Sequence, residues 1–303
     1  MNKLMIGLAA AGLCSAVFAD VTSANVVGYQ GVKLPEGRQM TCATFKNMTD
    51  TGMWLSDLMV IGYKNGMAEE FINEEGTGTY FSFQILNSTG GLVKEYYWRE
   101  TLDDPWGEPT WADDGCWKDK DGVVVQGHNK DTDVWLDKGS AVWFYAPEIF
   151  DGLETDGYAL QNAGEVLTLA QQVPMRNDGR MAIGNPFPID CWLSKISVTG
   201  YHDCTEMDDF INEEGTGTFF SFQLLNDFGG LKAEYYWRET LDDPWGEPTW
   251  AGDGCWKDKD GTVVYGENLE TDVIIKSGTG MWTLAPDFWG SDGYYMVFPG
   301  LKL

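Results

Sequence analysis

The sequence predicts an all-β protein of two tandem homologous domains, each an antiparallel β-sandwich or barrel, behind a signal peptide. Three observations predict this fold class: a long internal repeat, short runs with the two-residue periodicity of strands, and turn residues between those runs. At 303 residues the chain is long enough for two domains of ordinary size, each with its own core.

The internal repeat is domain-sized. Residues 71–147 align without gaps on residues 210–286 at an offset of 139, and 56 of the 77 positions are identical. Upstream, Trp54 and Tyr63 match Trp192 and Tyr201 at an offset of 138. Repeats of this length fold as domains, not as the small units of a solenoid. We therefore predict domains over 20–162 and 163–303, divided in a turn-rich stretch at 160–164.

Within a copy, the apolar residues alternate as they do in strands. In residues 80–86, Phe81, Phe83 and Ile85 alternate with Ser82 and Gln84, as a half-buried strand requires. Further strands are expected at 95–98, 123–125, 133–136 and 141–145, separated by turn residues at 90–91, 104–107, 120–122 and 138–139. Only 54–59 and 164–171 suit short helices. Many short strands at this spacing indicate a sandwich or barrel.

The first 19 residues have the pattern of a secretory signal peptide. Lys3 gives a basic start, residues 4–13 are apolar, and small residues lead to Ala19. The apolar run is shorter than the roughly 20 residues that cross a bilayer. We expect cleavage after Ala19 and a periplasmic, cell-surface or extracellular protein without a membrane span.

The charge of the chain is strongly acidic, with 47 acidic and 20 basic residues and a formal net charge of −27. Such a field repels nucleic acid, which binds clustered Lys and Arg. We expect no nucleic-acid partner; an envelope protein or an extracellular polysaccharide is the predicted partner class. Asp119-Lys120-Asp121-Gly122, which is repeated at 258–261, departs from the calcium-loop pattern and predicts a hairpin turn. No metal or cofactor is predicted.

The cysteines follow the repeat unevenly. Cys191 and Cys204 have no counterparts in the first copy, and two cysteines present in one copy only suggest a bonded pair. We predict a Cys191–Cys204 disulfide, which an exported setting permits. Cys116 and Cys255 are equivalent and fit either buried thiols or a pair across a pseudo-twofold axis, and the state of Cys42 is left open.

A tryptophan-rich acidic stretch is the candidate ligand site. Residues 95–112 are identical at all 18 positions to residues 234–251. Indoles cover the apolar face of a sugar while carboxylates accept its hydroxyls, so this composition favours carbohydrate; the alternative is that the indoles pack over sheet edges. The candidate ligand residues are Trp98, Asp103, Asp104, Trp106, Glu108 and Trp111, with Trp237, Asp242, Asp243, Trp245, Glu247 and Trp250 in the second copy.

No pattern for catalysis repeats in the two copies. His128 and His202 are the only histidines and neither has a histidine counterpart, which excludes a Ser-His triad or a histidine zinc site in each copy. We predict a non-enzyme; a carboxylate-dependent glycoside hydrolase is the alternative that the many acidic residues keep open. The predicted role is structural or adhesive, and a tandem carbohydrate-binding protein is the alternative.

Three short motifs carry a family resemblance. The stretch 22–29 (Thr-Ser-Ala-Asn-Val-Val-Gly-Tyr), Gly184-Asn185-Pro186-Phe187-Pro188 and Lys138-Gly139 before Trp143 resemble segments of exported, mostly uncharacterised proteins of Verrucomicrobia- and Lentisphaerae-type bacteria. The second copy departs from this pattern, with Ser277-Gly278 before Trp282. The resemblance implies an exported β-rich protein and assigns no catalytic residue.

Overall fold

The computed structural model describes residues 27–46, 52–64, 67–69, 81–86, 92–99, 116–146, 157–175, 179–202, 205–206, 220–225, 230–238, 255–285 and 293–301. Over these residues the protein is built of antiparallel β-strands and contains no α-helix, which confirms the predicted all-β class. We call the described residues up to 166 the N-terminal half and those from 167 onward the C-terminal half.

The N-terminal half contains twelve strands and one short 3-10 helix, η1 (Leu55–Asp57). The strands are β1 (Val27–Leu34), β2 (Gly37–Cys42), β3 (Phe45–Lys46), β4 (Gly52–Trp54), β5 (Met59–Lys64), β6 (Met67–Glu69), β7 (Phe81–Leu86), β8 (Leu92–Arg99), β9 (Cys116–Asp119), β10 (Trp135–Asp137), β11 (Ala141–Ala146) and β12 (Gly157–Val166).

The C-terminal half repeats this order from β13 onward, except that its described residues contain no counterpart of β3, and it has its own 3-10 helix, η2 (Leu193–Lys195). Its strands are β13 (Gln171–Met175), β14 (Gly179–Gly184), β15 (Cys191–Trp192), β16 (Ser197–His202), β17 (Thr205–Glu206), β18 (Phe220–Leu225), β19 (Leu231–Arg238), β20 (Cys255–Asp258), β21 (Ile274–Ile275), β22 (Gly280–Ala285) and β23 (Gly293–Phe298).

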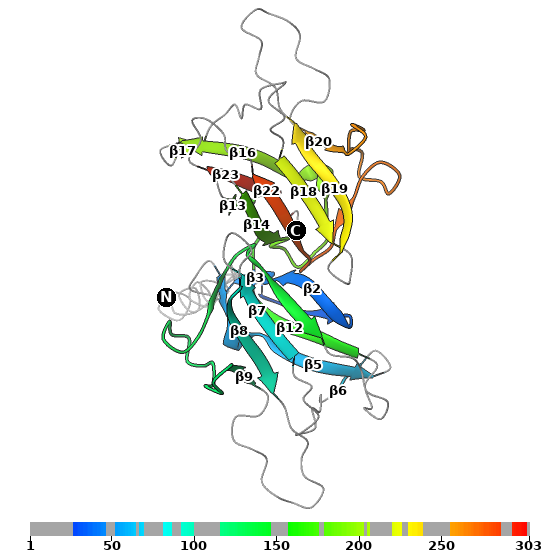
Figure 1. Cartoon of the computed structure of the whole chain (residues 1–303). Coiled ribbons are helices and arrows are strands. Elements are labelled where there is room, and N and C mark those ends of the chain that lie inside the picture. The colour runs from blue at the N-terminus through cyan, green and yellow to red at the C-terminus, as the bar shows by residue number, and fades with distance from the viewer. Residues whose placement is uncertain are drawn as a thin grey trace, which may run out of the picture.

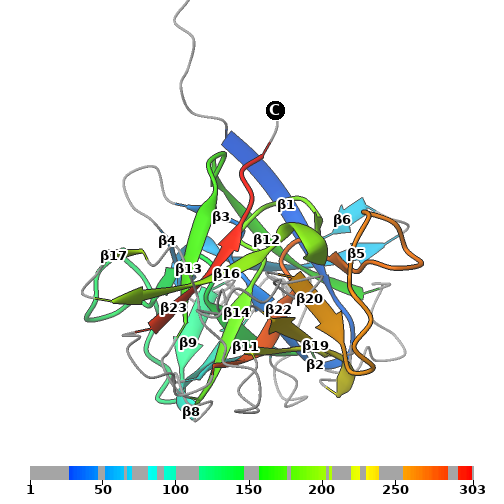
Figure 2. The same cartoon turned by 90° about the horizontal axis from the view of Figure 1, so that it is seen from above.

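The structure has four larger antiparallel sheets in a propeller-like arrangement, with two sheets from each half. Figures 1 and 2 show the two halves stacked along the long axis of the molecule. The N-terminal half supplies sheet I, in the order β1-β12-β5-β6 with β3 beside β12, and sheet II, in the order β2-β11-β7-β8-β9. The C-terminal half supplies sheet III (β13-β23-β16-β17) and sheet IV (β14-β22-β18-β19-β20). The pairs β10-β4 and β15-β21 are separate two-stranded sheets in corresponding places.

Each half buries its own hydrophobic cluster. One cluster is built only of N-terminal-half residues and includes Phe45, Trp117 and Phe144, each at most 1% exposed. The other is built only of C-terminal-half residues and includes Phe222 and Trp256, with the same degree of burial. A sheet must bury its apolar face against another layer, so each half packs its two larger sheets around one of these clusters.

Tertiary pairing overrides two local expectations. Residues 160–164, expected as a turn, lie inside β12, because β1 pairs with β12 over eight consecutive positions from Val27–Glu165 to Leu34–Tyr158. The same strand extends to Val166, so the short helix expected over 164–171 is wrong. The helix expected at 54–59 is reduced to the three-residue η1, and residues 123–125 contribute only a bridge between Val124 and Lys118.

The turn after β9 is the hairpin turn that its sequence predicts. The Asp119 carboxylate Oδ1 accepts hydrogen bonds from the backbone N–H groups of Asp121 and Val123, both at 2.9 Å. Gly122 follows with a φ of +81°, a conformation that glycine adopts without steric cost. Asp258 makes the same two bonds in the C-terminal half. These carboxylates therefore close turns in both copies.

The two halves meet through reciprocal contacts. The N–H of Cys42 donates to the carbonyl of Gly278 at 3.0 Å, and the N–H of Gly184 donates to the carbonyl of Gly139 at 2.8 Å. Gly139 and Gly278 are equivalent in the repeat, as are Cys42 at the end of β2 and Gly184 at the end of β14. The same bond is thus made twice with the roles of the halves exchanged, which indicates an approximate twofold axis between them.

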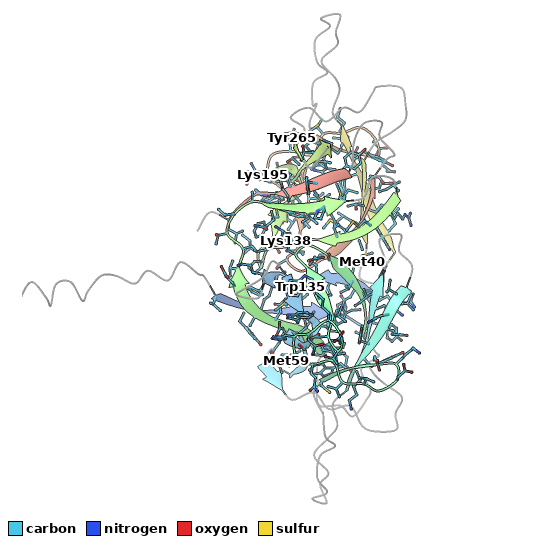
Figure 3. The ribbon with its side chains drawn as sticks, turned by 90° about the vertical axis from the view of Figure 1, so that its left-hand side faces the viewer. Met40, Met59, Trp135, Lys138, Lys195 and Tyr265 are labelled. Atoms are coloured by element: carbon cyan, nitrogen blue, oxygen red, sulfur yellow. The ribbon has the colours of Figure 1, made fainter. Side chains whose placement is uncertain are left out.

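Side chains repeat this reciprocity. Gln30 Nε2 donates to Ser277 Oγ at 2.6 Å, and Lys138 Nζ donates to Gln171 Oε1 at 2.8 Å. Lys138 and Ser277 are equivalent residues, and each contacts a glutamine on the first strand of the opposite half. Lys138 and Met40 lie near mid-height of the molecule in Figure 3, where the halves join.

The two later motifs of the family resemblance lie at this junction. Gly139 and Gly278 have φ values of +71° and +68°, and a side chain on either would run into Val173 or Val32 of the opposite half. Their turns are therefore docking elements that require glycine. The carbonyl of Asn185, in the other motif, accepts a hydrogen bond from Cys42 Sγ at 3.0 Å. Both motifs thus hold the halves together.

Candidate functional site

Two of the predicted ligand residues lie in the protein interior. Trp98 is 3% exposed and Trp237 is 6% exposed. Each packs edge-on against the next buried indole, Trp117 or Trp256, with ring centroids 5.4 Å apart. They are core residues rather than parts of an exposed sugar-binding surface, because alternation along β8 and β19 turns them inward. The other candidates, Asp103, Asp104, Trp106, Glu108, Trp111, Asp242, Asp243, Trp245, Glu247 and Trp250, lie outside the described residues.

The predicted disulfide is absent at the one partner that the structure describes. Cys191 is a free thiol in β15, opposite Ile275, and its Sγ lies 3.5 Å from the carbonyl of Trp192. Cys204 lies outside the described residues. Cys116 and Cys255 begin β9 and β20, which lie at opposite ends of the molecule in Figure 1, so they do not pair across the pseudo-twofold axis.

Burial controls the chemistry of two thiols. Complete burial raises the pKa of the Cys42 thiol far above its ordinary value. Partial burial, with smaller contributions from the Asp272 and Glu267 charges, raises the pKa of Cys191 to about 11. Since the thiolate is the nucleophile, both groups are protonated and inert near neutral pH.

We therefore expect Cys42 and Cys191 to resist alkylation in the folded protein at pH 8. Peptide-level mass spectrometry after a short maleimide pulse, with and without prior denaturation, measures this site by site. Labelling of Cys191 should rise as the pH approaches 11, whereas Cys42 should react only after unfolding. Rapid labelling of Cys42 in the folded protein, or a Cys191–Cys204 peptide in the unreduced digest, would contradict this assignment.

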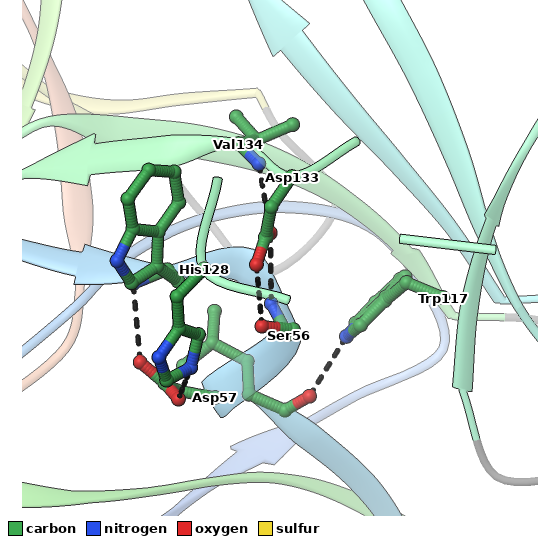
Figure 4. Close-up of polar contacts among 8 residues, drawn as sticks. Ser56, Asp57, Trp117, His128, Asp133 and Val134 are labelled. Carbon is green, nitrogen blue, oxygen red and sulfur yellow. Dashed lines mark hydrogen bonds and ion pairs between the residues drawn. The ribbon is translucent and has the colours of Figure 1, made fainter. Parts of the chain in front are cut away.

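A cluster of polar side chains surrounds η1 and contains the residue types of a hydrolase triad (Figure 4). Asp133, 6% exposed, accepts hydrogen bonds from Ser56 Oγ at 2.5 Å and from the N–H of Val134 at 2.7 Å. It also accepts the N–H of Ser56 at 3.3 Å. The carboxylate thus ties η1 to the segment that enters β10.

His128 forms a separate pair beside it. Its Nε2 lies 2.6 Å from Asp57 Oδ1, and its ring stacks on Trp54 with centroids 6.1 Å apart and planes 7° from parallel. Trp135 meets the same indole edge-on at 5.1 Å. His128 is half exposed, and its backbone has a φ of +49°.

These two pairs do not form a catalytic triad. A triad needs the histidine to take the serine proton while a carboxylate orients the far side of the ring. Here the Ser56 hydroxyl donates to Asp133, whereas His128 contacts Asp57. The arrangement serves to fix η1 and its neighbours, not to activate a nucleophile.

The C-terminal half makes the same two side-chain contacts, but the residue types in one of them differ. Ser194 Oγ donates to Asp272 at 2.5 Å, as in the N-terminal half. Asp57 and His128 are replaced by Lys195 and Glu267, whose charged atoms lie 2.6 Å apart. The hydrogen bond and charge of Glu267 raise the pKa of Lys195. The acidic residue is on η1 in the N-terminal half and on the facing segment in the C-terminal half. The feature that the two halves share is therefore the contact between these positions, not the residue types.

Sequence reasoning missed this pairing although a signal was present. The two positions differ together between the copies, from an acid and a histidine to a lysine and an acid. When two positions in distant segments change charge together, the two side chains are expected to contact each other.

A row of partly buried aromatic and polar residues also repeats in both halves. On sheet II, Gln84 Nε2 donates to Glu95 Oε1 at 3.4 Å, and Trp143 stands opposite Gln84 in the adjacent strand. Gln223, Glu234 and Trp282 repeat this arrangement on sheet IV, again with a 3.4 Å amide–carboxylate contact. The two half-buried indoles meet at the junction, with centroids 6.2 Å apart. Amides, carboxylates and indoles side by side are groups that contact sugars.

Comparisons of the chain with protein-family models, with curated proteins and with solved structures return no match. Among the helices that the structure describes, none has the length and apolar character to cross a membrane. The repeated contacts of the chain itself are therefore the basis for a functional conclusion.

Proposed function

We propose that the chain is an exported, non-catalytic β-repeat protein with a structural or adhesive role, and that its two homologous halves are β-domains that act as one bridging body. The observation that supports this proposal is that two equivalent strands, β8 and β19, point in opposite directions. β8 and β19 run outward toward opposite ends of the molecule in Figure 1, and each is followed in the sequence by the same Trp- and Asp-rich stretch.

The rigidity of the junction supports this role. The backbone and side-chain bonds between the halves hold one copy at a defined orientation to the other. The strands that precede the two identical stretches, β8 and β19, point to opposite ends, which suits the joining of two partners. This arrangement suits simultaneous binding to one short polymer poorly, since avidity is lost when geometry forbids joint engagement.

The test separates binding from bridging in the mature full-length protein. Residues 103–111 are replaced by a Gly/Ser sequence of equal length in the first copy only, in the second copy only (242–250), or in both. Binding to purified envelope is measured by co-sedimentation, and bridging by the aggregation of envelope-coated beads. We expect each single replacement to keep binding and abolish aggregation, and the double replacement to abolish both. Absence of binding by the unmodified protein, or aggregation by a single replacement, would overturn the proposal.

Carbohydrate binding is the second candidate function, favoured by the repeated Trp, Gln and Glu row on sheets II and IV. A glycan array with the unmodified protein tests it directly. Two double variants, Gln84→Ala plus Gln223→Ala and Trp106→Ala plus Trp245→Ala, distinguish the sheet face from the acidic stretches. Loss of signal in either variant supports a sugar-binding role and locates it. An array without hits rejects it.

A further inference from the structure

The junction between the halves places equivalent residues against one another. Trp143 meets Trp282, its counterpart in the repeat. Cys42 at the end of β2 faces Gly184 at the end of β14 in the same way. Near a twofold axis a residue and its equivalent occupy adjoining space, so two identical side chains compete for it.

At two positions of this cluster the chain relieves the competition by omitting the side chain of the C-terminal half. A Cβ added to Gly184 would lie 2.6 Å from Cys42 Cβ and would also collide with its Sγ. A Cβ added to Gly280 would lie 2.6 Å from Met40 Cβ and 2.8 Å from Ala141 Cβ. Both glycines belong to the C-terminal half, and both opposing groups belong to the N-terminal half.

These contacts lie in a small buried cluster that bridges the halves. Met40, Cys42 and Ala141 of the N-terminal half pack there with Ala182 of the C-terminal half, and Trp143 and Trp282 cover them. Each of the four is at most 9% exposed. Tightly packed interiors accept neither added atoms nor vacated space without loss of stability.

We propose that this surface is a partner-selective interface on which an N-terminal half accepts a C-terminal half and rejects a second copy of itself. Two N-terminal halves would press Cys42 against Cys42 and Met40 against Ala141. Two C-terminal halves would oppose glycine to glycine and leave a void. The selectivity is steric, because side chains would clash between two N-terminal halves and a cavity would remain between two C-terminal halves.

The partner that this surface fits is therefore the complementary repeat of the same chain. Each molecule covers this surface with its own two halves. This inference concerns how the bridging body is assembled and stands independently of what its ends bind.

A double-mutant cycle in the full-length protein tests the steric match. Gly184→Ala is expected to lower the thermal unfolding midpoint by about 5 °C, because the new methyl overlaps Cys42. Cys42→Gly should restore part of that loss in the Gly184→Ala background while lowering the midpoint on its own; recovery is partial because Thr279 O stays 3.0 Å from the new Cβ. The matched control is Gly31→Ala, where the nearest atom, Ala159 Cβ, is 3.8 Å away and no loss is expected. Strictly additive effects, or a Gly184→Ala variant as stable as the control, would refute the match.

Which halves associate with each other can be measured after the folded chain is cleaved between them. Leu169 lies between β12 and β13 and is 77% exposed, which makes residues 168–169 suitable for an inserted protease site. Two preparations whose N-terminal halves differ in mass are cleaved, mixed and examined by native mass spectrometry. We expect only pairs of one N-terminal and one C-terminal half. Complexes containing two N-terminal halves would overturn the proposal, and if the cleaved halves unfold, the double-mutant cycle decides.

Discussion

Replacing Trp117 by alanine is expected to lower the free energy of unfolding by about 3–5 kcal/mol. The indole is 1% exposed and packs edge-on against Trp98 and Phe144, with centroid distances of 5.4 Å and 5.9 Å. Its Nε1 donates to the carbonyl of Leu58 at 2.7 Å, which links β9 to the residue after η1. The substitution therefore removes a large core side chain and leaves a buried carbonyl without its donor.

Urea unfolding followed by far-ultraviolet circular dichroism measures this loss. Trp117→Phe should cost less, since it keeps one aromatic ring in the core, although it loses the Nε1 donor and part of the indole volume. Tyr265→Ala is the control: the side chain is 57% exposed, and substitutions at such sites stay within about 0.5 kcal/mol. A Trp117→Ala protein as stable as this control would show that the indole is not part of the core.

The equivalent substitution in the C-terminal half, Trp256→Ala, tests whether the two halves unfold together. Trp256 makes the same bond to the carbonyl of Ile196 at 2.7 Å. If the halves unfold as one body, Trp256→Ala should shift the entire transition, as Trp117→Ala does. Two separate transitions would instead show that the junction couples the halves weakly.

The second large effect is expected at Asp133, where alanine should cost about 3 kcal/mol. The carboxylate satisfies the Ser56 hydroxyl and two backbone N–H groups around η1, and its removal leaves these donors poorly solvated. Thermal and urea unfolding of Asp133→Ala, Ser56→Ala and the double variant measure the contact. The losses should be less than additive, because the same hydrogen bond is removed in both single variants.

Asp131 provides the matched control in the same segment. Its side chain is exposed, and Asp131→Ala should leave stability unchanged within about 0.5 kcal/mol. Additive losses at Ser56 and Asp133, or a stable Asp133→Ala protein, would contradict the framework role assigned to this carboxylate. Asp272→Ala should behave alike, since Ser194 and Asp272 repeat the contact.

Several local features were predictable because short-range chemistry controls them. The alternation in residues 80–86 became β7, and the run at 141–145 became β11. The Asp-Lys-Asp-Gly segments became hairpin turns, since the first carboxylate caps its own backbone two and four residues later. Such interactions need no distant partner.

The candidate ligand site shows where local reasoning stops. Trp98 and Trp106 look alike as exposed aromatic candidates in an acidic stretch, but the inward face of β8 places Trp98 in the core. The direction of a side chain depends on which face of a sheet is covered, and the covering sheet is distant in sequence. The pairing of Cys191 with Ile275 illustrates the same point, because the presence of Cys191 and Cys204 in one copy only had suggested a disulfide.

By itself, the sequence determined the all-β class, the 139-residue offset of the repeat and the hairpin turns, because periodicity, duplication and turn chemistry are local properties. Only the tertiary structure decided that the repeats interlock, with Cys42 against Gly184 and the Gly139 and Gly278 turns docked on opposite halves. The reason is physical: a glycine in isolation signals a turn or a flexible link, and its role as vacant space appears only when the opposing side chain is in place.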